Sequence, residues 1–446
     1  MHILPQLRKL EQKYRETLAV VGVHSSKFPN ERETANLRHA VHRYGIEHPV
    51  VNDRDFAIWQ SYGVRAWPSM MFIDPVGKVI GKHEGEFEFA IFDRLITGMT
   101  AEFETAGVLD RTLLPHQVAS IGASSAPIAY PGKIEIDPAV GELLIADSNH
   151  NRIIFSTPDG EVIRVVGSGT AGDQDGTAEN ASFWGPQGIA FDDNNVYVAD
   201  AENHLVRRIE RKSFSVETIA GTGGQALIRH ADGNAKSMPI NSPYDLVLLD
   251  DALYVAMAGF HQLWVIDVSG GTMRPFAGDG REDIVDGSLN ASRLAQPYGI
   301  TVNSGTLYFA DSETSSIRRA GTGPDGRVET LVGTGLFDFG DRDGVGDAVL
   351  LQHVQGLTSG GGSIYFVDTY NHKIKVLDPS TRTVITVAGS GQSGHEDGAL
   401  LAASFNEPAG LTYHEDFLYV ADTNNHAIRK VDIEAGNVST IELRGL

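Results

Sequence analysis

The most regular feature of the chain is a short apolar run that ends on an acid and is followed by a polar turn. The run occurs six times, and five of the six copies end on Asp. The end of the run falls at residues 147, 200, 257, 311, 368 and 422, so the copies lie 53 to 57 residues apart. Self-similarity at a nearly fixed period is stronger evidence of a repeat architecture than local propensity is.

Each repeat contains four runs that are rich in β-branched and aromatic residues and are separated by Gly, Asn, Asp and Pro. In the second repeat these runs cover residues 188–192, 196–200, 205–210 and 215–220. Four short antiparallel strands in each of six repeats are typical of a β-propeller. The pattern therefore predicts an all-β, six-bladed propeller over residues 131–446.

The first 100 residues follow a different pattern. Residues 1–14 carry leucines at helical spacing, residues 17–24 form an apolar strand, and helical and strand-like runs then alternate up to residue 99. Strands that alternate with helices predict an α/β layer fold. Residues 101–130 are rich in small residues and Pro, and we expect them to form a linker between the two domains.

Composition and charge narrow the possible functions. The chain contains no cysteine, which excludes disulfides, thiolate metal sites and a cysteine nucleophile within it. Residues 1–130 hold 14 Lys+Arg and 15 Asp+Glu, whereas residues 131–446 hold 22 and 43, a net charge of −21. An acidic surface repels phosphate backbones, so we expect no nucleic-acid partner.

The sequence also bears on location and assembly. No run approaches the roughly 18 apolar residues that a membrane span needs, and no basic start precedes an apolar stretch. We therefore expect no membrane association and a cytoplasmic location. We also expect a monomer that holds no cofactor and no metal ion.

The polar turns after the acids resemble those of a known family, the NHL (Asn-His-Leu) repeat proteins. The triplet itself occurs as Asn203-His204-Leu205, and most other turns carry the same Asn-His pair. Basic residues follow the turns at Arg152, Arg207, Arg318, Lys373 and Arg429. The resemblance covers about 315 residues and implies a six-bladed propeller. The third repeat has Met257 in place of Asp and the fourth has Ser315 in place of His, so we expect looser turns in these two blades.

The acids and histidines of the turns are candidate site residues. Each Asp ends a strand before a tight turn, where it can accept backbone N–H bonds and pair with the following basic residue, so we expect a mainly structural role. These acids are Asp147, Asp200, Asp311, Asp368 and Asp422. The histidines His204, His261, His372 and His426 belong to separate blades, and they are therefore not expected to share one metal ion.

The connections between blades carry a second set of acids, each followed by Gly. They are Asp175, Asp232, Asp286, Asp343 and Asp397, and we expect them on the same face of the ring as the turns. One interpretation is that each Asp-Gly forms a turn that packs over the neighbouring blade. The other is that this loop-rich face is a binding rim for a protein or peptide partner, or for a cation.

A propeller enzyme is a further alternative. Six-bladed propellers include hydrolases and a zinc-dependent lyase, which need His or Asp side chains on the innermost strands. Five of the predicted innermost strands, at residues 189–191, 246–248, 300–302, 357–359 and 411–413, contain almost no such side chains, although His414 follows the last. We therefore do not expect catalysis in the central channel.

The first 100 residues resemble a thioredoxin-like domain. The diagnostic stretch is Val64-Arg65-Ala66-Trp67-Pro68-Ser69, and in that family this proline is cis, so we predict a cis Trp67–Pro68 bond. The family's Cys-x-x-Cys motif would fall just before Met1, and its first central strand is also missing. We therefore expect an incomplete domain whose natural chain begins further upstream.

The combination of both parts resembles the NHL-repeat-containing protein 2 family, in its bacterial form. This resemblance implies a thiol–disulfide oxidoreductase-like domain whose targets are recruited by the propeller. Without cysteine, the chain as given cannot perform dithiol exchange, because the attacking thiolate is absent. The sequence thus predicts a redox-linked scaffold, with a pure protein- or cation-binding module as the alternative.

Overall fold

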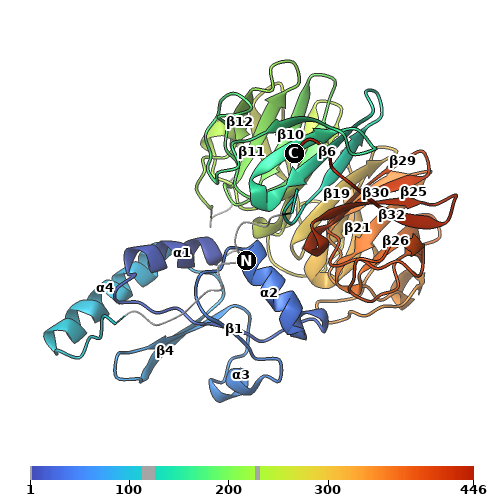
Figure 1. Cartoon of the computed structure of the whole chain (residues 1–446). Helices are drawn as coiled ribbons and strands as arrows, with labels where there is room; N and C mark the ends of the chain where they lie inside the picture. Colours follow the sequence, from blue (N-terminus) through green and yellow to red (C-terminus); the bar gives the residue numbers. More distant parts are fainter. Residues whose placement is uncertain (1–2, 113–125, 227–231) are drawn as a thin grey trace. The chain divides into compact units, whose positions relative to one another are not determined.

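The computed structural model describes residues 3–112, 126–226 and 232–446. Its internal contacts divide the chain into two units, Met1–Ala123 and Ser124–Leu446. In Figure 1 the first unit is blue to cyan and the second runs from green to red. The predicted linker, residues 101–130, begins within a helix of the first unit, and its residues 113–125 lie outside the described part.

The first unit alternates helices and short strands in the predicted order. Its elements are α1 (Leu4–Lys13), β1 (Gly22–His24), the 3₁₀ turn η1 (Asn30–Arg32), α2 (Thr34–Arg43), β2 (Val50–Asn52), α3 (Ala57–Ser61), β3 (Ser69–Ile73), β4 (Val79–Glu84) and α4 (Phe89–Thr105). Pro5 lies in the first turn of α1, where the missing N–H costs nothing, and the apolar face of α1 packs on α4 around Leu10, Phe92 and Ile96.

The strands of the first unit form two separate pairs among the described residues. β1 pairs with β2 in parallel, and β3 pairs with β4 in antiparallel fashion. Neither pair is wide enough to bury both of its faces, so Val23, Val51 and Ile80 stay exposed. The strand at residues 17–24 is shorter than predicted, because its regular pairing begins at Gly22.

The second unit is a ring of six blades within the described residues, as predicted. Blades 1 and 2 are β5 (Ile134–Asp137), β6 (Glu142–Asp147), β7 (Arg152–Ser156), β8 (Val162–Val166) and β9 (Pro186–Phe191), β10 (Asn195–Asp200), β11 (Leu205–Glu210), β12 (Val216–Ala220). Blades 3 and 4 are β13 (Gly233–Asn234), β14 (Pro243–Leu249), β15 (Ala252–Met257), β16 (Gln262–Asp267), β17 (Thr272–Ala277) and β18 (Gly287–Ser288), β19 (Pro297–Asn303), β20 (Thr306–Asp311), β21 (Ser316–Gly321), β22 (Arg327–Val332). Blades 5 and 6 are β23 (Gly344–Val345), β24 (Leu357–Gly360), β25 (Ser363–Asp368), β26 (Lys373–Asp378), β27 (Thr383–Ala388) and β28 (Gly398–Ala399), β29 (Gly410–His414), β30 (Phe417–Asp422), β31 (Ala427–Asp432), β32 (Asn437–Ile441).

Each blade is an antiparallel meander whose first long strand lies innermost. In blades 3 to 6 a two-residue strand from the preceding connection adds a fifth, outer strand. The innermost strands β5, β9, β14, β19, β24 and β29 contact one another in a closed ring. Along the ring the colour runs from green to red, and the last blade lies beside the first (Figure 1).

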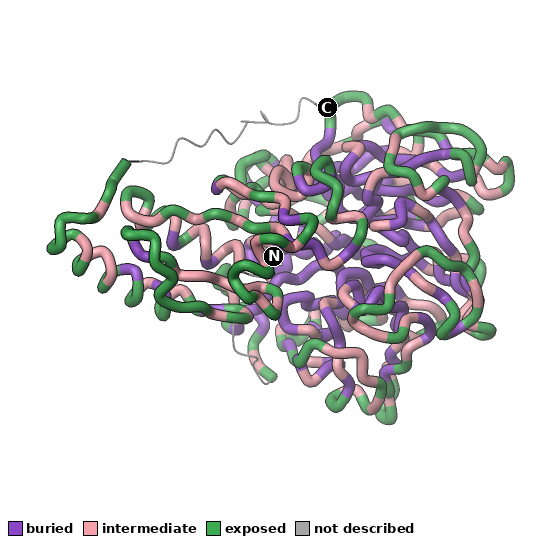
Figure 2. The backbone as a smooth tube through the Cα atoms, turned by 90° about the horizontal axis from the view of Figure 1, so that it is seen from below, coloured by how far each residue is buried: buried purple, intermediate pink, exposed green. Residues whose placement is uncertain are grey.

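The core of the propeller lies between blades. Each of its six main apolar clusters combines side chains from two consecutive blades, for example Tyr254 of blade 3 with Ile300 and Phe309 of blade 4. Figure 2 shows that buried residues concentrate in the blades, whereas most of the first unit is intermediate or exposed. Because every blade needs a neighbour on both sides to bury its faces, the ring is stable only when it is closed.

Candidate functional site

The turn between the second and third long strand has the same geometry in all six blades. A 3₁₀ turn in five blades, and a hydrogen-bonded turn at residues 201–204 in blade 2, leads to a residue in the left-handed conformation, with φ between 50° and 54°; these residues are Asn151, His204, His261, Ser315, His372 and His426. The expectation of looser turns in blades 3 and 4 is wrong, because His261 and Ser315 adopt φ values of 52° and 50°. The turn therefore tolerates Met257 or Ser315 at the positions of its Asp and His.

The side chains at this left-handed position join neighbouring blades. Each accepts a hydrogen bond from a backbone N–H just before the next innermost strand, at 3.0 to 3.2 Å; the donors are Gly185, Ser242, Gln296, His353, Glu407 and Tyr130. In the histidines the acceptor is Nδ1, which places the proton of the neutral ring on Nε2. Tyr130 donates to His426 of the last blade, so the same bond closes the ring.

The Asp at the strand end binds on two sides. One carboxylate oxygen accepts the N–H of the residue 16 to 18 positions earlier, for example that of Trp184 at 2.8 Å from Asp200. The other oxygen accepts from a buried basic side chain, as from Arg207 at 2.8 Å. All five acids, Asp147, Asp200, Asp311, Asp368 and Asp422, are fully buried, and each makes both contacts. Burial raises the pKa of Asp200 to about 6 against the opposing effect of Arg207.

Four of the five predicted rim acids bind the same basic side chains from the other side. Arg207 bonds to Asp175 at 2.7 Å, Arg318 to Asp286 at 3.0 Å and Arg429 to Asp397 at 2.7 Å. The acids also accept from a threonine of the outer strand; these threonines are Thr218, Thr330, Thr386 and Thr440. Each acid comes from the connection that precedes the blade, so its bond to the basic side chain fastens that connection to the blade. We call this arrangement, in which one basic side chain bonds to the strand-end acid and to the rim acid, a latch. Partner or cation binding by these carboxylates stays a prediction.

Blade 5 makes the same latch with lysine. Lys375 lies 3.2 Å from Asp368 and 3.1 Å from Asp343, and it donates to Asp341 at 2.8 Å. The sequence assigned this role to Lys373, whose ammonium instead pairs with Asp341. The latch uses the seventh residue after the Asp and not the fifth, as it does in blades 2, 4 and 6.

Blade 3 replaces the charged latch with apolar side chains. Met257 stands for the Asp and Trp264 for the Arg, and both are fully buried in a cluster with Phe260. The indole N–H donates to the Oε1 of Gln262 at 3.1 Å. Asp232, the rim acid of this blade, is exposed. A buried ion pair can be exchanged for packed apolar residues without loss of the fold.

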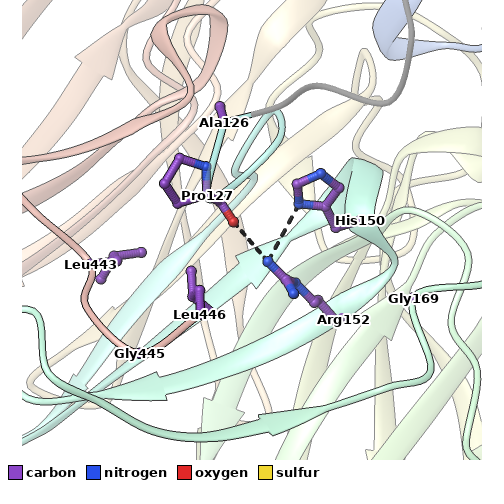
Figure 3. A pocket seen from close by; sticks show the side chains of 8 residues that line it. All are labelled: Ala126, Pro127, His150, Arg152, Gly169, Leu443, Gly445 and Leu446. Atoms are coloured by element: carbon purple, nitrogen blue, oxygen red, sulfur yellow. Dashed lines mark hydrogen bonds between the residues drawn. The ribbon is translucent and has the colours of Figure 1, made fainter.

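Blade 1 differs in another way and borders a pocket of about 510 Å³. Here the basic residue is Arg152, two positions earlier than in the other blades, and its Nε donates to Asp147 at 2.7 Å. Figure 3 shows the Arg152 side chain between His150 and the carbonyl of Pro127, to which it donates at 2.7 Å. Leu443 and Leu446 form the apolar side of the pocket (Figure 3).

In the first unit the Trp67–Pro68 bond is cis, the form that the sequence predicts. The indole N–H of Trp67 donates to the carbonyl of Ser25 at 2.7 Å, and the Ser25 hydroxyl donates to Asp53 at 2.8 Å. The ring of Trp67 packs against Trp59 with centroids 4.4 Å apart, yet 47% of Trp67 is exposed. The loop therefore presents an aromatic surface that is held from behind by hydrogen bonds.

The sequence analysis passed over three charged residues on the innermost strands. Lys133, Glu135 and Asp245 belong to blades 1 and 3 and lie in the central channel, where Lys133 Nζ is 3.6 Å from Asp245 Oδ2. The five predicted stretches do not include these residues, because Asp245 lies just before residues 246–248 and blade 1 is not among the five. An alignment of the six repeats would have revealed them, because the other four blades carry Gly at the position of Lys133 and Asp245.

Two observations concern metals and membranes. Among residues 3–112, 126–226 and 232–446, no three His, Asp or Glu side chains come together as a metal site. No helix in the part that the structure describes is long and apolar enough to span a membrane.

Comparison with known proteins identifies the repeat and the relatives. Residues 183–209 and 405–431, in blades 2 and 6, match the family described as NHL repeat. The chain is 42% identical over 469 residues to Protein SUPPRESSOR OF QUENCHING 1, chloroplastic, of Arabidopsis thaliana, covering 100% of this chain and 44% of that protein. It is 36% identical over 481 residues to NHL repeat-containing protein 2 of Gallus gallus, covering 99% of this chain and 66% of that protein.

A shorter similarity connects part of the chain to a redox enzyme. Over 83 residues it is 29% identical to the thiol-disulfide oxidoreductase ResA of Halalkalibacterium halodurans, which covers 18% of this chain and 44% of that protein. The chain thus spans less than half of its Arabidopsis relative and about two thirds of its chicken relative.

Proposed function

The chain belongs to the family of NHL repeat-containing protein 2, and from this premise we propose that it is a redox-linked scaffold. In this proposal the first unit is a thioredoxin-like domain that binds polypeptide segments, and the propeller recruits a protein partner. The observation that carries the proposal is the exposed indole of Trp67 on the cis-Pro68 loop.

The geometry of that loop supports polypeptide binding. An aromatic side chain that stays exposed while its polar atom is held internally offers rigid contact area at a low entropy cost. Trp67 meets this description, because Ser25 holds its N–H and Trp59 supports its ring. The partial similarity to ResA, whose name is that of a thiol–disulfide oxidoreductase, supports a thioredoxin-like origin for the unit.

The chemistry available to these 446 residues excludes dithiol exchange. Dithiol exchange begins with attack by a thiolate, and the chain contains no cysteine. A redox link therefore has to come from the partner or from a further polypeptide segment.

The charge of the propeller supports a basic partner. Residues 131–446 carry a net charge of −21, and such a field attracts basic surfaces and speeds their association. The exposed Asp232 lies on the loop face beside the blade without a charged latch. We place the partner on this face.

Binding of an unfolded polypeptide tests the role of Trp67. We would measure binding of the full chain to a fluorescent, carboxymethylated and permanently unfolded protein, and compare Trp67→Ala with Trp184→Ala. Trp184 is a matched control, because it is also exposed (38%) but belongs to the propeller. We expect at least about tenfold weaker binding for Trp67→Ala, as for a binding hot spot, and no change for Trp184→Ala. Equal affinities for Trp67→Ala and the parent chain would refute the proposal.

Two further measurements test the other parts of the proposal, namely the lack of dithiol exchange and the basic partner. In an insulin-reduction assay with dithiothreitol, the chain should accelerate precipitation no more than an unrelated cysteine-free protein does. A labelled Lys-rich peptide should bind more tightly than a Glu-rich peptide of the same length, and its affinity should fall as salt is added. Equal binding of both peptides would contradict the basic partner.

A further inference from the structure

The innermost strands approach one another closely at one equivalent position, which lies at the start of each strand or directly before it. Four blades carry glycine there: Gly188, Gly299, Gly356 and Gly410. A Cβ on Gly299 would lie 2.4 Å from the carbonyl oxygen of Gln355, and one on Gly356 would lie 2.5 Å from that of Ala409. The channel is therefore narrow at this level, and side chains enter it from the remaining two blades, as Lys133 and Asp245.

Lys133 and Asp245 neutralise one another in this narrow part. The ammonium of Lys133 donates to the carbonyl oxygens of Gln355 at 2.6 Å and Ala409 at 3.0 Å, and it lies 3.6 Å from Asp245. The Asp245 carboxylate also accepts the N–H groups of Leu246 and Ile300. Both side chains are more than nine-tenths buried, so the pair spans the channel from one wall to the other.

A second level of polar side chains lies two residues further along the same strands. Blade 1 contributes Glu135, and blades 4, 5 and 6 contribute Thr301, Thr358 and Thr412. Their registers match, because each threonine pairs with the tyrosine of the adjoining strand, namely Tyr308, Tyr365 and Tyr419. The Thr412 hydroxyl donates to Glu135 at 3.1 Å, which shows that this level faces the neighbouring innermost strand and the channel.

Two of these hydroxyls are unused. Thr301 and Thr358 are 9% and 7% exposed, and among the described residues neither hydroxyl has a hydrogen-bonding partner. Neither oxygen is among the fully buried unpaired side-chain atoms of the described residues, so both are open to the channel and can bind a water or an ion there.

The charges of the channel indicate which kind of ligand it could bind. The charge of Lys133 opposes the rise in the pKa of both Glu135 and Asp245. When both carboxyls are ionised, however, one positive charge faces two negative ones. An uncompensated carboxylate in an enclosed space is costly unless it takes up a proton or a cation. We propose that the channel below the Lys133–Asp245 pair binds one monovalent cation, of the class of sodium, potassium or ammonium, through Glu135 and the threonine hydroxyls.

The donor set favours a single charge. Calcium ordinarily takes six to eight oxygen ligands with several carboxylates, whereas here one carboxylate is joined by neutral hydroxyls. One monovalent cation also brings the sum of Lys133, Asp245 and Glu135 to zero. Burial, reinforced by the charge of Asp245, raises the pKa of Glu135 to about 8 in the cation-free channel, so below this pH the cation has to displace a proton from the carboxyl.

The thermal stability of the full chain tests this proposal. Calorimetric scans in sodium, potassium and ammonium chloride would be compared with scans in tetramethylammonium chloride, whose methyl groups keep oxygen ligands away from its charge, at about 0.15 M ionic strength. At least one small cation should raise the melting temperature of the propeller by about 2 °C or more. Glu135→Gln should abolish this rise, whereas Glu434→Gln, which removes one exposed charge of the same kind, should retain it.

The position of the bound cation in a crystal provides a second, direct test. Crystals of the full chain soaked in thallium(I) or rubidium salts should show an anomalous peak beside Glu135. If Glu135→Gln does not fold, Thr358→Val takes its place and should reduce the rise in melting temperature. The proposal is overturned if no small cation stabilises the chain more than tetramethylammonium does, or if the anomalous peak lies elsewhere.

Discussion

The Nδ1 atom of His372 in blade 5 accepts a hydrogen bond from the backbone N–H of Glu407 at 3.1 Å, just before the innermost strand of blade 6. The equivalent bond in blade 1 uses the amide oxygen of Asn151, which accepts from Gly185 at 3.1 Å. Asparagine and histidine thus perform the same task at equivalent positions of one ring, with a chemical difference: histidine can be protonated on the atom that accepts the bond.

The pH dependence of stability should therefore change in His372→Asn. Burial lowers the pKa of His372 against the opposing effect of Glu407, so the native ring is neutral. Its contribution to stability is complete above the ordinary pKa of 6.5 and is lost as the pH falls below that value. Urea denaturation should show a smaller loss below pH 6.5 for His372→Asn than for the parent chain. Exposed His395 provides the control, and an unchanged slope in His372→Asn would contradict the bond.

The basic residue of a charged latch should be far more sensitive than its exposed acid. Arg429 contacts fully buried Asp422 at 2.7 Å and partly exposed Asp397 at 2.7 Å. Arg429→Met leaves Asp422 buried without its cation, and this should cost about 3–5 kcal/mol of unfolding free energy. Asp397→Asn should cost about 1 kcal/mol, as for one hydrogen bond at a surface. Similar losses in both variants would show that burial does not set the strength of the latch.

Blade 3 suggests how the loss can be recovered. The double variant Asp422→Met with Arg429→Trp copies the Met257 and Trp264 pair of that blade. It should be more stable than Arg429→Met alone, because no unpaired charge remains buried. Chemical denaturation of the two variants in parallel provides the measurement, and a double variant that is less stable than the single one would argue against interchangeable latches.

The glycines of the channel should not tolerate a methyl group. In Gly410→Ala the new Cβ would lie 2.7 Å from both the carbonyl oxygen of Gly132 and the Cα of Lys133. Neither atom can move without opening the closure between blades 6 and 1, so we expect a loss of several kcal/mol or no soluble protein. In Gly323→Ala the Cβ meets nothing within 4 Å and should change stability by less than about 0.5 kcal/mol. Melting temperatures of the two variants decide the point.

The acid of the channel should make the protein less stable in alkali. The pKa of Glu135 rises from its ordinary value of 4.5 to about 8 through burial and the charge of Asp245. An acid with a raised native pKa binds its proton more tightly when folded, so its effect on stability becomes steadily more unfavourable as the pH rises between 4.5 and 8. Glu135→Gln should flatten this part of the stability profile in tetramethylammonium buffers, where no small cation competes. An identical profile for both chains would exclude the raised pKa.

Much of the second unit follows from the sequence alone. The recurring acid and turn predict six blades and their strands, because a period of 53 to 57 residues with four β-rich runs leaves few other folds. The cis bond before Pro68 also follows from a local stretch. Both features depend on residues that are near neighbours along the chain.

Contacts between repeats could not be predicted in this way. The rim acids appear in the sequence as a free acidic face, yet Asp175 contacts Arg207, 32 residues away, and Asp397 is equally distant from Arg429. Lys373 and Lys375 are both basic residues after a turn, and the folded structure shows that Lys375 is the one that pairs with Asp368.

The sequence by itself determined the repeat, the lack of cysteine chemistry and the acidity of the propeller, because composition and periodicity are properties of the chain. The tertiary structure decided which charges remain free. Closing the ring brings Lys133 of blade 1 within 3.6 Å of Asp245 of blade 3 and leaves Glu135 beside them. Residues more than a hundred positions apart share a channel only when all six blades are in place, so no local pattern could have assembled these three charges.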